Sequence, residues 1–298
     1  MKNLHGMIVP LATPMTEDGT VDVARLRTLC KTQIQAGIDV LFVLGTTGEF
    51  YALTSTQRRQ VVQTVLEESA GKVPVIAGIS GDSTTSAREA LAAVKDKALA
   101  GYVASTPYFL SYTQAELIDY FRSLTEAAGG PLVIYNFPMR YRHVIELDTV
   151  AELLREKLVF AIKDTSGQFD YFQGLVRLKQ QFPEFSVFEG ALANLPKSGP
   201  LGIDGSVQAL TNLLPVQCAG LWRRIEQKQW PELTKEAGWM WEFHQKIEQV
   251  AIFIAAMKGC IELRGWCGRV PGQPTRPVSD EAMNRLKKLM NQYYPNLE

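Results

Sequence analysis

The chain has 298 residues, of which 46% are hydrophobic and 21% charged, which suits one large α/β barrel or two ordinary domains. Its 31 basic side chains balance 31 acidic ones. This balance argues against nucleic acid or an anionic membrane as partner, because both require clustered positive charge. The N-terminus lacks a signal-peptide pattern, and no uncharged apolar run reaches the ~20 residues that a bilayer requires. We expect a cytoplasmic protein that acts on a small molecule.

The cysteines and histidines show no spacing typical of a metal site. They are scattered as Cys30, Cys218, Cys260, Cys267, His5, His143 and His244. Without a CxxC pair, they predict free thiols in a reducing compartment, and neither a metal nor a cofactor is expected.

Short apolar runs alternate with longer amphipathic segments along most of the chain. In chain order, the expected elements are a strand at Gly6–Thr13, a helix at Asp22–Ala36, a strand at Val40–Gly45, a helix at Thr56–Ser69, a strand at Val73–Ile79, a helix at Thr84–Ala100, a strand at Tyr102–Thr106, a helix at Thr113–Ala128, strands at Pro131–Asn136 and Val159–Asp164, a helix at Phe169–Phe182, and strands at Phe185–Gly190 and Gly205–Leu210. Several helices begin with Ser, Thr or Asp in the N-cap position.

This alternation predicts a (β/α)8 TIM barrel spanning residues 1–228. A doubly wound open sheet would place a phosphate-binding glycine fingerprint after the first strand, and Pro10–Pro14 is not one. Residues 229–298 read as a C-terminal helical extension, with helices at Trp230–Leu263 and Asp280–Gln292 separated by a Gly/Pro-rich connector. The extension is expected to pack on the barrel or on a neighbouring subunit.

The strand ending at Asp164 carries Lys163 where side chains of such barrels converge on one cavity. Burial there disfavours the ammonium form and releases an amine that can attack a carbonyl. The ordinary alternative is a lysine paired with the adjacent Asp164. The preceding strand places Tyr135 at a similar height, where its phenol could move a proton or simply bond to backbone.

A third feature is the turn Gly45-Thr46-Thr47-Gly48-Glu49 after the second expected strand. Its two glycines let successive N–H groups curve around an anion, and a carboxylate would suit such a site. The turn lacks the lysine of a nucleotide P-loop. Most glycine-rich turns bind nothing, but this one joins a lysine and a tyrosine at the same rim.

Six motifs together resemble the dihydrodipicolinate synthase and N-acetylneuraminate lyase superfamily of class I pyruvate aldolases, across nearly the whole chain. They are Gly6–Pro14, Gly45–Glu49, Thr106-Pro-Tyr108, Tyr135-Asn-Phe-Pro138, Ile162–Gly167 and Gly202–Ser206. The resemblance implies that Lys163 forms the Schiff base with pyruvate and that Tyr135 shuttles the proton. It implies that Thr46, Thr47 and Gly48 hold the pyruvate carboxylate, with Thr47 also catalytic. It further implies that Gly190 and Val207 contact substrate and that the protein is a homotetramer, a dimer of dimers.

Two positions bear on the second substrate. The family usually has a tyrosine at the position of Phe109. That tyrosine reaches the neighbouring subunit's site and connects the threonine relay to solvent. A phenyl ring cannot pass a proton, so the relay must run through water, Tyr108 or Tyr112. Arg140 falls where the synthases bind the carboxylate of their aldehyde, although an exposed loop arginine is the alternative.

The leading hypothesis is therefore a Schiff-base pyruvate aldolase or lyase acting on a 2-keto-3-deoxy acid through a lysine–pyruvate enamine. The alternative is 4-hydroxy-tetrahydrodipicolinate synthase, favoured by Arg140 and by the motif Gly45–Glu49 and opposed by Phe109. Sialic acid ranks low, because the segments Gly190–Ala193 and Gln208–Leu210 are largely apolar. Two other functional classes are a binding protein that has lost turnover and a metal-dependent barrel aldolase. The sequence leaves the aldehyde, the direction of reaction and any allosteric ligand open.

Overall fold

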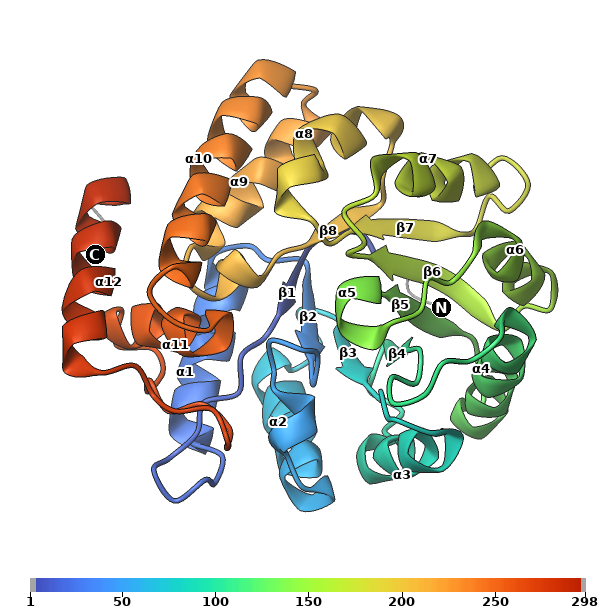
Figure 1. Ribbon diagram of the computed structural model, residues 1–298, viewed down its shortest axis with the longest axis horizontal. Coiled ribbons are helices and arrows are strands. Elements are labelled where there is room, and N and C mark those ends of the chain that lie inside the picture. Colours follow the sequence, from blue (N-terminus) through green and yellow to red (C-terminus); the bar gives the residue numbers. More distant parts are fainter. Residues whose placement is uncertain (1–3, 296–298) are drawn as a thin grey trace.

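The computed structural model describes residues 4–295 and contains a closed barrel of eight parallel strands in sequential order (Figure 1). The strands are β1 (Gly6–Pro10), β2 (Val40–Val43), β3 (Val75–Gly78), β4 (Gly101–Ser105), β5 (Leu132–Asn136), β6 (Val159–Asp164), β7 (Ser186–Glu189) and β8 (Gly205–Val207). The barrel closes where β1 pairs with β8, with Gly6 opposite Gly205. Nearly every strand residue is buried, as expected for a parallel sheet covered on its outer face by helices. The predicted (β/α)8 fold is confirmed.

Helices alternate with the strands and continue beyond the barrel. They are α1 (Val23–Gln35), α2 (Ser55–Ser69), α3 (Thr84–Val94), α4 (Gln114–Ala128), α5 (Pro138–Tyr141), α6 (Leu147–Arg155), α7 (Phe169–Leu178), α8 (Leu195–Ser198), α9 (Pro215–Glu226), α10 (Trp230–Glu248), α11 (Phe253–Leu263) and α12 (Asp280–Tyr293), with a short 3-10 helix η1 (Phe50–Ala52) after β2. The expected N-caps are confirmed at Asp22 and Thr113, whose side chains accept a backbone N–H of the first turn. The helices expected from Thr56 and Thr84 are capped slightly earlier, by Thr54 and Ser83.

Some expected boundaries were wrong, for local physical reasons. The third helix ends at Val94 rather than Ala100, because Lys95 is extended and the Asp96 carboxylate accepts from Ala98 N–H, a local bond that competes with helix. The segment expected as one helix from 230 to 263 is two helices, since Ile252 is extended between α10 and α11.

Two barrel helices were missed altogether. Helix α6 has no side-chain hydrogen bond at its N-cap, Glu146, and α9 follows Leu214 with Pro215 in its first turn. Both therefore lack the Ser, Thr or Asp start signal. Most strands also end one to three residues earlier than expected, because the chain leaves the sheet for loops that form the rim.

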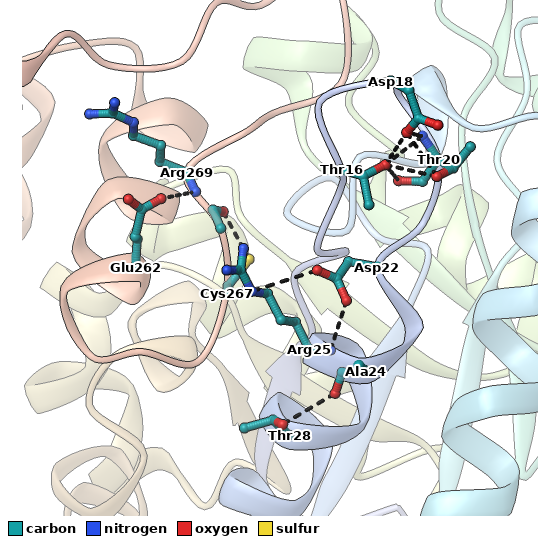
Figure 2. A network of polar contacts seen from close by, with 11 residues as sticks. Thr16, Asp18, Thr20, Asp22, Ala24, Arg25, Thr28, Glu262, Cys267 and Arg269 are labelled. Carbon is teal, nitrogen blue, oxygen red and sulfur yellow. Dashed lines mark hydrogen bonds and ion pairs between the residues drawn. The ribbon is translucent and has the colours of Figure 1, made fainter.

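The C-terminal helices α10 to α12 lie on the side of the barrel formed by β1, α1 and α9 (Figure 1). Their connector reaches the start of α1 (Figure 2), where Asp22 caps α1 and pairs with Arg25 at 3.6 Å. On the connector, the Cys267 thiol donates to Gly268 O at 3.1 Å. The Glu262 carboxylate accepts from Arg269 N–H. Among residues 4–295, no helix is long and apolar enough to cross a membrane.

Candidate active site

Lys163 and Tyr135 are direct neighbours on adjacent strands. They are register partners between β6 and β5, and residues opposite each other in a pleated sheet point to the same face. The Lys163 Nζ lies 3.9 Å from the centroid of the Tyr135 ring and 5.6 Å from that of Phe42. The lysine is 7% exposed, so its amine sits among aromatic faces at the end of the barrel.

No carboxylate within residues 4–295 forms an ion pair with Lys163. Asp164 is the next residue along the strand and turns away, accepting from Asn136 Nδ2 at 2.7 Å and from the Ser166 hydroxyl at 2.8 Å. The lysines that form ion pairs within residues 4–295 are Lys31, Lys179 and Lys258. The alternative expectation of a Lys163–Asp164 pair is therefore wrong, because the strand's alternation places the two side chains on opposite faces.

Burial without a counter-charge shifts the pKa values of Lys163 and Tyr135. Desolvation lowers the pKa of Lys163 to about 7, which leaves much of the amine uncharged near neutrality. Burial raises the pKa of Tyr135 to about 12, opposed by the neighbouring hydroxyls of Thr165 and Thr46 and by the charge of Arg140. A free amine thus faces a phenol that holds its proton, the pair that imine formation needs.

The turn after β2 reaches the same rim, though its backbone differs from the expectation. The left-handed residues are Leu44 (φ 58°) and Glu49 (φ 56°), not the two glycines. Gly48 is required for another reason: a Cβ there would lie 2.9 Å from Leu11 O. In the described part of the chain, the N–H groups of Thr46, Thr47 and Gly48 donate to no protein acceptor, so they are available to a carboxylate.

The Thr46 hydroxyl is bonded to a residue that the sequence did not single out. Its Oγ1 lies 2.9 Å from the hydroxyl of Tyr141, at the end of α5. Tyr108, one of the hydroxyls expected to serve the relay, is half-buried with its ring 5.9 Å from that of Tyr141. No sequence signal marks Tyr141, which only the fold of the 138–145 loop brings to the site.

The other predicted substrate contacts lie around this group. Val207 is buried at the end of β8. Gly190 follows β7, and a Cβ there would come within 2.1 Å of Thr165 Oγ1, so only glycine fits. Arg140 is exposed on α5, and its charge is near enough to Tyr135 and Tyr51 to oppose the rise in their pKa.

Thr165 is a second residue that the sequence reasoning missed, although it lies within the quoted Lys163-containing motif. Its hydroxyl is buried beside the Tyr135 phenol and makes no hydrogen bond of normal geometry within residues 4–295. A buried hydroxyl without a partner can bond a polar group of a substrate. The described residues contain no group of three His, Cys, Asp or Glu side chains that could hold a metal ion.

Comparison with known proteins finds enzymes among the relatives of this chain. The chain is 32% identical over 212 residues to the 4-hydroxy-tetrahydrodipicolinate synthase of Aromatoleum aromaticum, covering 71% of this chain and 72% of that protein. It is 31% identical to an Escherichia coli K12 protein named as a probable 2-dehydro-3-deoxy-D-pentonate aldolase, YjhH (75% of each), and 31% identical to an N-acetylneuraminate lyase of E. coli (76% and 75%). The barrel and its relatives define a class I aldolase-type lyase.

A family model and a solved structure agree with that class. The model described as "Dihydrodipicolinate synthetase family" matches residues 3–293. The crystal structure of YagE, a prophage protein of the dihydrodipicolinic acid synthase family from E. coli K12 in complex with pyruvate, superposes with a TM-score of 0.91 at 26% identity and covers 97% of this chain and 98% of its own. The chain belongs to the dihydrodipicolinate synthetase family, and the resemblance expected from its motifs is confirmed.

Proposed function

We propose that the protein cleaves or forms a 2-keto-3-deoxy acid through a Schiff base between Lys163 and pyruvate. The observation that carries this proposal is the buried amine of Lys163, which lies 3.9 Å from the Tyr135 ring centroid, has a pKa lowered to about 7 by desolvation and forms no ion pair within residues 4–295. Its relatives include enzymes named as synthase, aldolase and lyase, so the substrate must be argued from the residues around the amine.

Imine formation follows from the two groups. The substrate carboxylate binds the N–H groups of Thr46, Thr47 and Gly48, which directs its C2 carbonyl toward Lys163. The amine attacks C2, and the resulting C2 hydroxyl takes the proton of the Tyr135 phenol and leaves as water. The nitrogen keeps one hydrogen and becomes a protonated imine, while Tyr135 is left as a phenolate.

Cleavage uses the phenolate as base. In a 2-keto-3-deoxy acid, the C4 hydroxyl gives its proton to Tyr135 as the C3–C4 bond breaks, and the electron pair moves through C3 to the imine nitrogen. This releases an aldehyde and leaves the enamine of pyruvate. Protonation of C3 by Tyr135 restores the imine, and water then frees pyruvate and the amine.

Thr165 and the apolar rim support a short hydroxylated substrate. The unpartnered Thr165 hydroxyl lies beside Tyr135, where a C4 hydroxyl would be held during proton transfer. Gln208 already donates to Ser206 Oγ at 2.9 Å, and Ala191 and Leu192 offer no polar side chain. A long polyol such as sialic acid would leave several hydroxyls unpaired, at roughly 1–3 kcal/mol each.

The alternative, 4-hydroxy-tetrahydrodipicolinate synthase, is favoured by one observation. The charge of Arg140 acts on Tyr135 and Tyr51 at the mouth, where it could bind the carboxylate of aspartate semialdehyde. Assays of both substrates with the same preparation separate the two functions.

The protein is also proposed to be a cytoplasmic homotetramer. Large apolar side chains are exposed on the loops that surround the site. They are Tyr51, Phe109, Leu110 and Met139. Such a patch is typical of a surface that another subunit covers, and light scattering at several protein concentrations would test the assembly.

Borohydride trapping tests the mechanism. With pyruvate present, borohydride should add a reduced pyruvyl group to one peptide, the one that contains Lys163, because only an imine is trapped this way. Lys163→Ala should abolish both labelling and turnover. The matched control is Lys197→Ala, an exposed lysine on α8 whose Nζ lies 5.8 Å from the Phe169 ring. Labelling at another lysine, or none, would refute the Schiff-base mechanism.

A further inference from the structure

The Thr46 and Tyr141 hydroxyls form a buried contact at the centre of the candidate site. Their oxygens are 2.9 Å apart, and Tyr141 is 5% exposed. The Tyr141 ring packs edge-on against that of Tyr135, with centroids 5.5 Å apart. Thr46 also lies close enough to the Tyr135 phenol to lower its pKa. Thr46 therefore stands between two phenols of the same chain.

Tyr141 is held in place by a histidine with a defined tautomer. The Nε2 of the buried His143 accepts from Tyr112 N–H at 2.7 Å, so its proton must be on Nδ1, which lies 2.8 Å from Tyr141 O. The imidazole thus ties the loop that follows β5 to the loop that follows β4. Arg142 is left-handed (φ 64°) between them, which turns the chain back after Tyr141.

We propose that Tyr141 is the positioning residue of the proton relay: it donates its hydrogen bond to Thr46, so that Thr46 directs its only proton at the Tyr135 oxygen. This inference rests on the proposed Schiff-base function. A threonine hydroxyl has a single proton and can accept through its lone pairs. With Tyr141 as donor, Thr46 is left to donate toward Tyr135, which stabilises the phenolate formed when Tyr135 gives up its proton.

The arrangement makes a phenol at position 109 unnecessary. Phe109 carries no hydroxyl, and the main-chain N–H of Tyr112 donates to His143 Nε2. Tyr108 packs against Tyr141 but is not bonded to Thr46. The hydroxyls of Tyr135, Thr46 and Tyr141 therefore all come from one subunit.

The test is Tyr141→Phe, which removes one oxygen from a buried ring, with Tyr108→Phe as the matched control. The main readout is exchange of the pyruvate C3 hydrogens for deuterium in D2O, followed by NMR, because it reports enamine formation without any aldehyde. We expect Tyr141→Phe to slow exchange by about 10–100-fold, part of the ~10²–10⁴-fold range of acid–base catalysis, and Tyr108→Phe to leave it unchanged. Borohydride should still label Lys163 in both.

Thr46→Val is the second variant. Combined with Tyr141→Phe, it separates a positioning role of Tyr141 from a packing defect. Valine matches the shape of threonine without the hydroxyl, so Thr46→Val should slow exchange as much as Tyr141→Phe does. In the double variant the two losses should not add, whereas independent packing defects would add. Thr46→Ser should retain most of the exchange rate.

The outcomes are distinguishable. If the parent protein shows no trapping at Lys163, the proposed function fails. If trapping occurs but Tyr141→Phe exchanges at the parent rate, or faster, then Thr46 donates to Tyr141 and this inference alone is wrong. If Tyr141→Phe does not fold, normal exchange by Thr46→Val overturns the inference equally well.

Discussion

Lys258 and Glu49 form an ion pair whose side chains are both 0% exposed. The pair joins α11 of the C-terminal extension to the turn that carries Thr46 and Thr47. Each partner has a further bond across the same junction, since Lys258 Nζ donates to Val270 O at 2.8 Å and Glu49 accepts from Gly272 N–H at 2.6 Å. The C-terminal extension is therefore bonded to the turn that carries the candidate carboxylate-binding N–H groups.

Removing one partner should cost far more than removing both. We expect Lys258→Met to lower the free energy of unfolding by about 3–5 kcal/mol, because it leaves the Glu49 carboxylate buried and unpaired. The double change Glu49→Gln, Lys258→Met should recover much of that loss. Urea unfolding followed by circular dichroism measures both. The control is Lys31→Met, whose more exposed pair with Glu68 should contribute about 0–1 kcal/mol. A loss in Lys258→Met no larger than in the control would contradict the buried-charge argument.

The pH dependence of turnover should report the acidity of Lys163. In the proposed mechanism the unprotonated amine attacks the substrate, and the pKa of Lys163 is about 7, so kcat/KM should rise about tenfold per pH unit below 7 and level off above it. An ordinary lysine would keep the rate rising to about pH 10.4. Because burial raises the pKa of Asp164 to about 6, Asp164→Asn is the control, and the limb near 7 should persist in it. If the limb near pH 7 disappears in Asp164→Asn, the titration belongs to the Asp164 carboxyl group.

Arg140 should distinguish acidic from neutral second substrates. If its guanidinium binds a carboxylate of the aldehyde, Arg140→Ala should weaken kcat/KM for acidic aldehydes by roughly 1.5–3 kcal/mol, the scale of a hydrogen bond to a charged group. Neutral aldehydes and pyruvate imine formation should be nearly unchanged, because the pyruvate carboxylate is assigned to the turn at Thr46–Gly48. Arg142→Ala, a second exposed arginine on the same loop, is the control. Equal losses for acidic and neutral aldehydes would mean that Arg140 only supports the loop.

The barrel and the position of Lys163 at its rim could be predicted because they depend on local signals. Alternating apolar runs predict parallel strands, and a lysine that ends such a run must lie at the rim. The Lys258–Glu49 pair could not be predicted, since it joins distant parts of the chain through a connector without periodicity. Tyr141 could not be predicted either, because its place depends on the turn after Pro138 and on the tautomer of His143. The missing helices α6 and α9 show the same limit, as neither begins with a capping side chain.

The last prediction concerns Phe109→Tyr. The contact between Thr46 and Tyr141 reverses what the sequence alone predicts for this variant. From the sequence alone, the absent phenol predicts a weak dihydrodipicolinate synthase that a tyrosine at 109 would improve. In the structure the Thr46 hydroxyl is already bonded to Tyr141, and Phe109 is 74% exposed. We therefore expect Phe109→Tyr to change deuterium exchange into pyruvate by less than about twofold, since Thr46 already has a hydrogen-bond partner within its own subunit. The same substitution in the Tyr141→Phe background is the informative comparison. A gain of tenfold or more in the parent background would show that a phenol at 109 reaches the relay and that Tyr141 does not suffice.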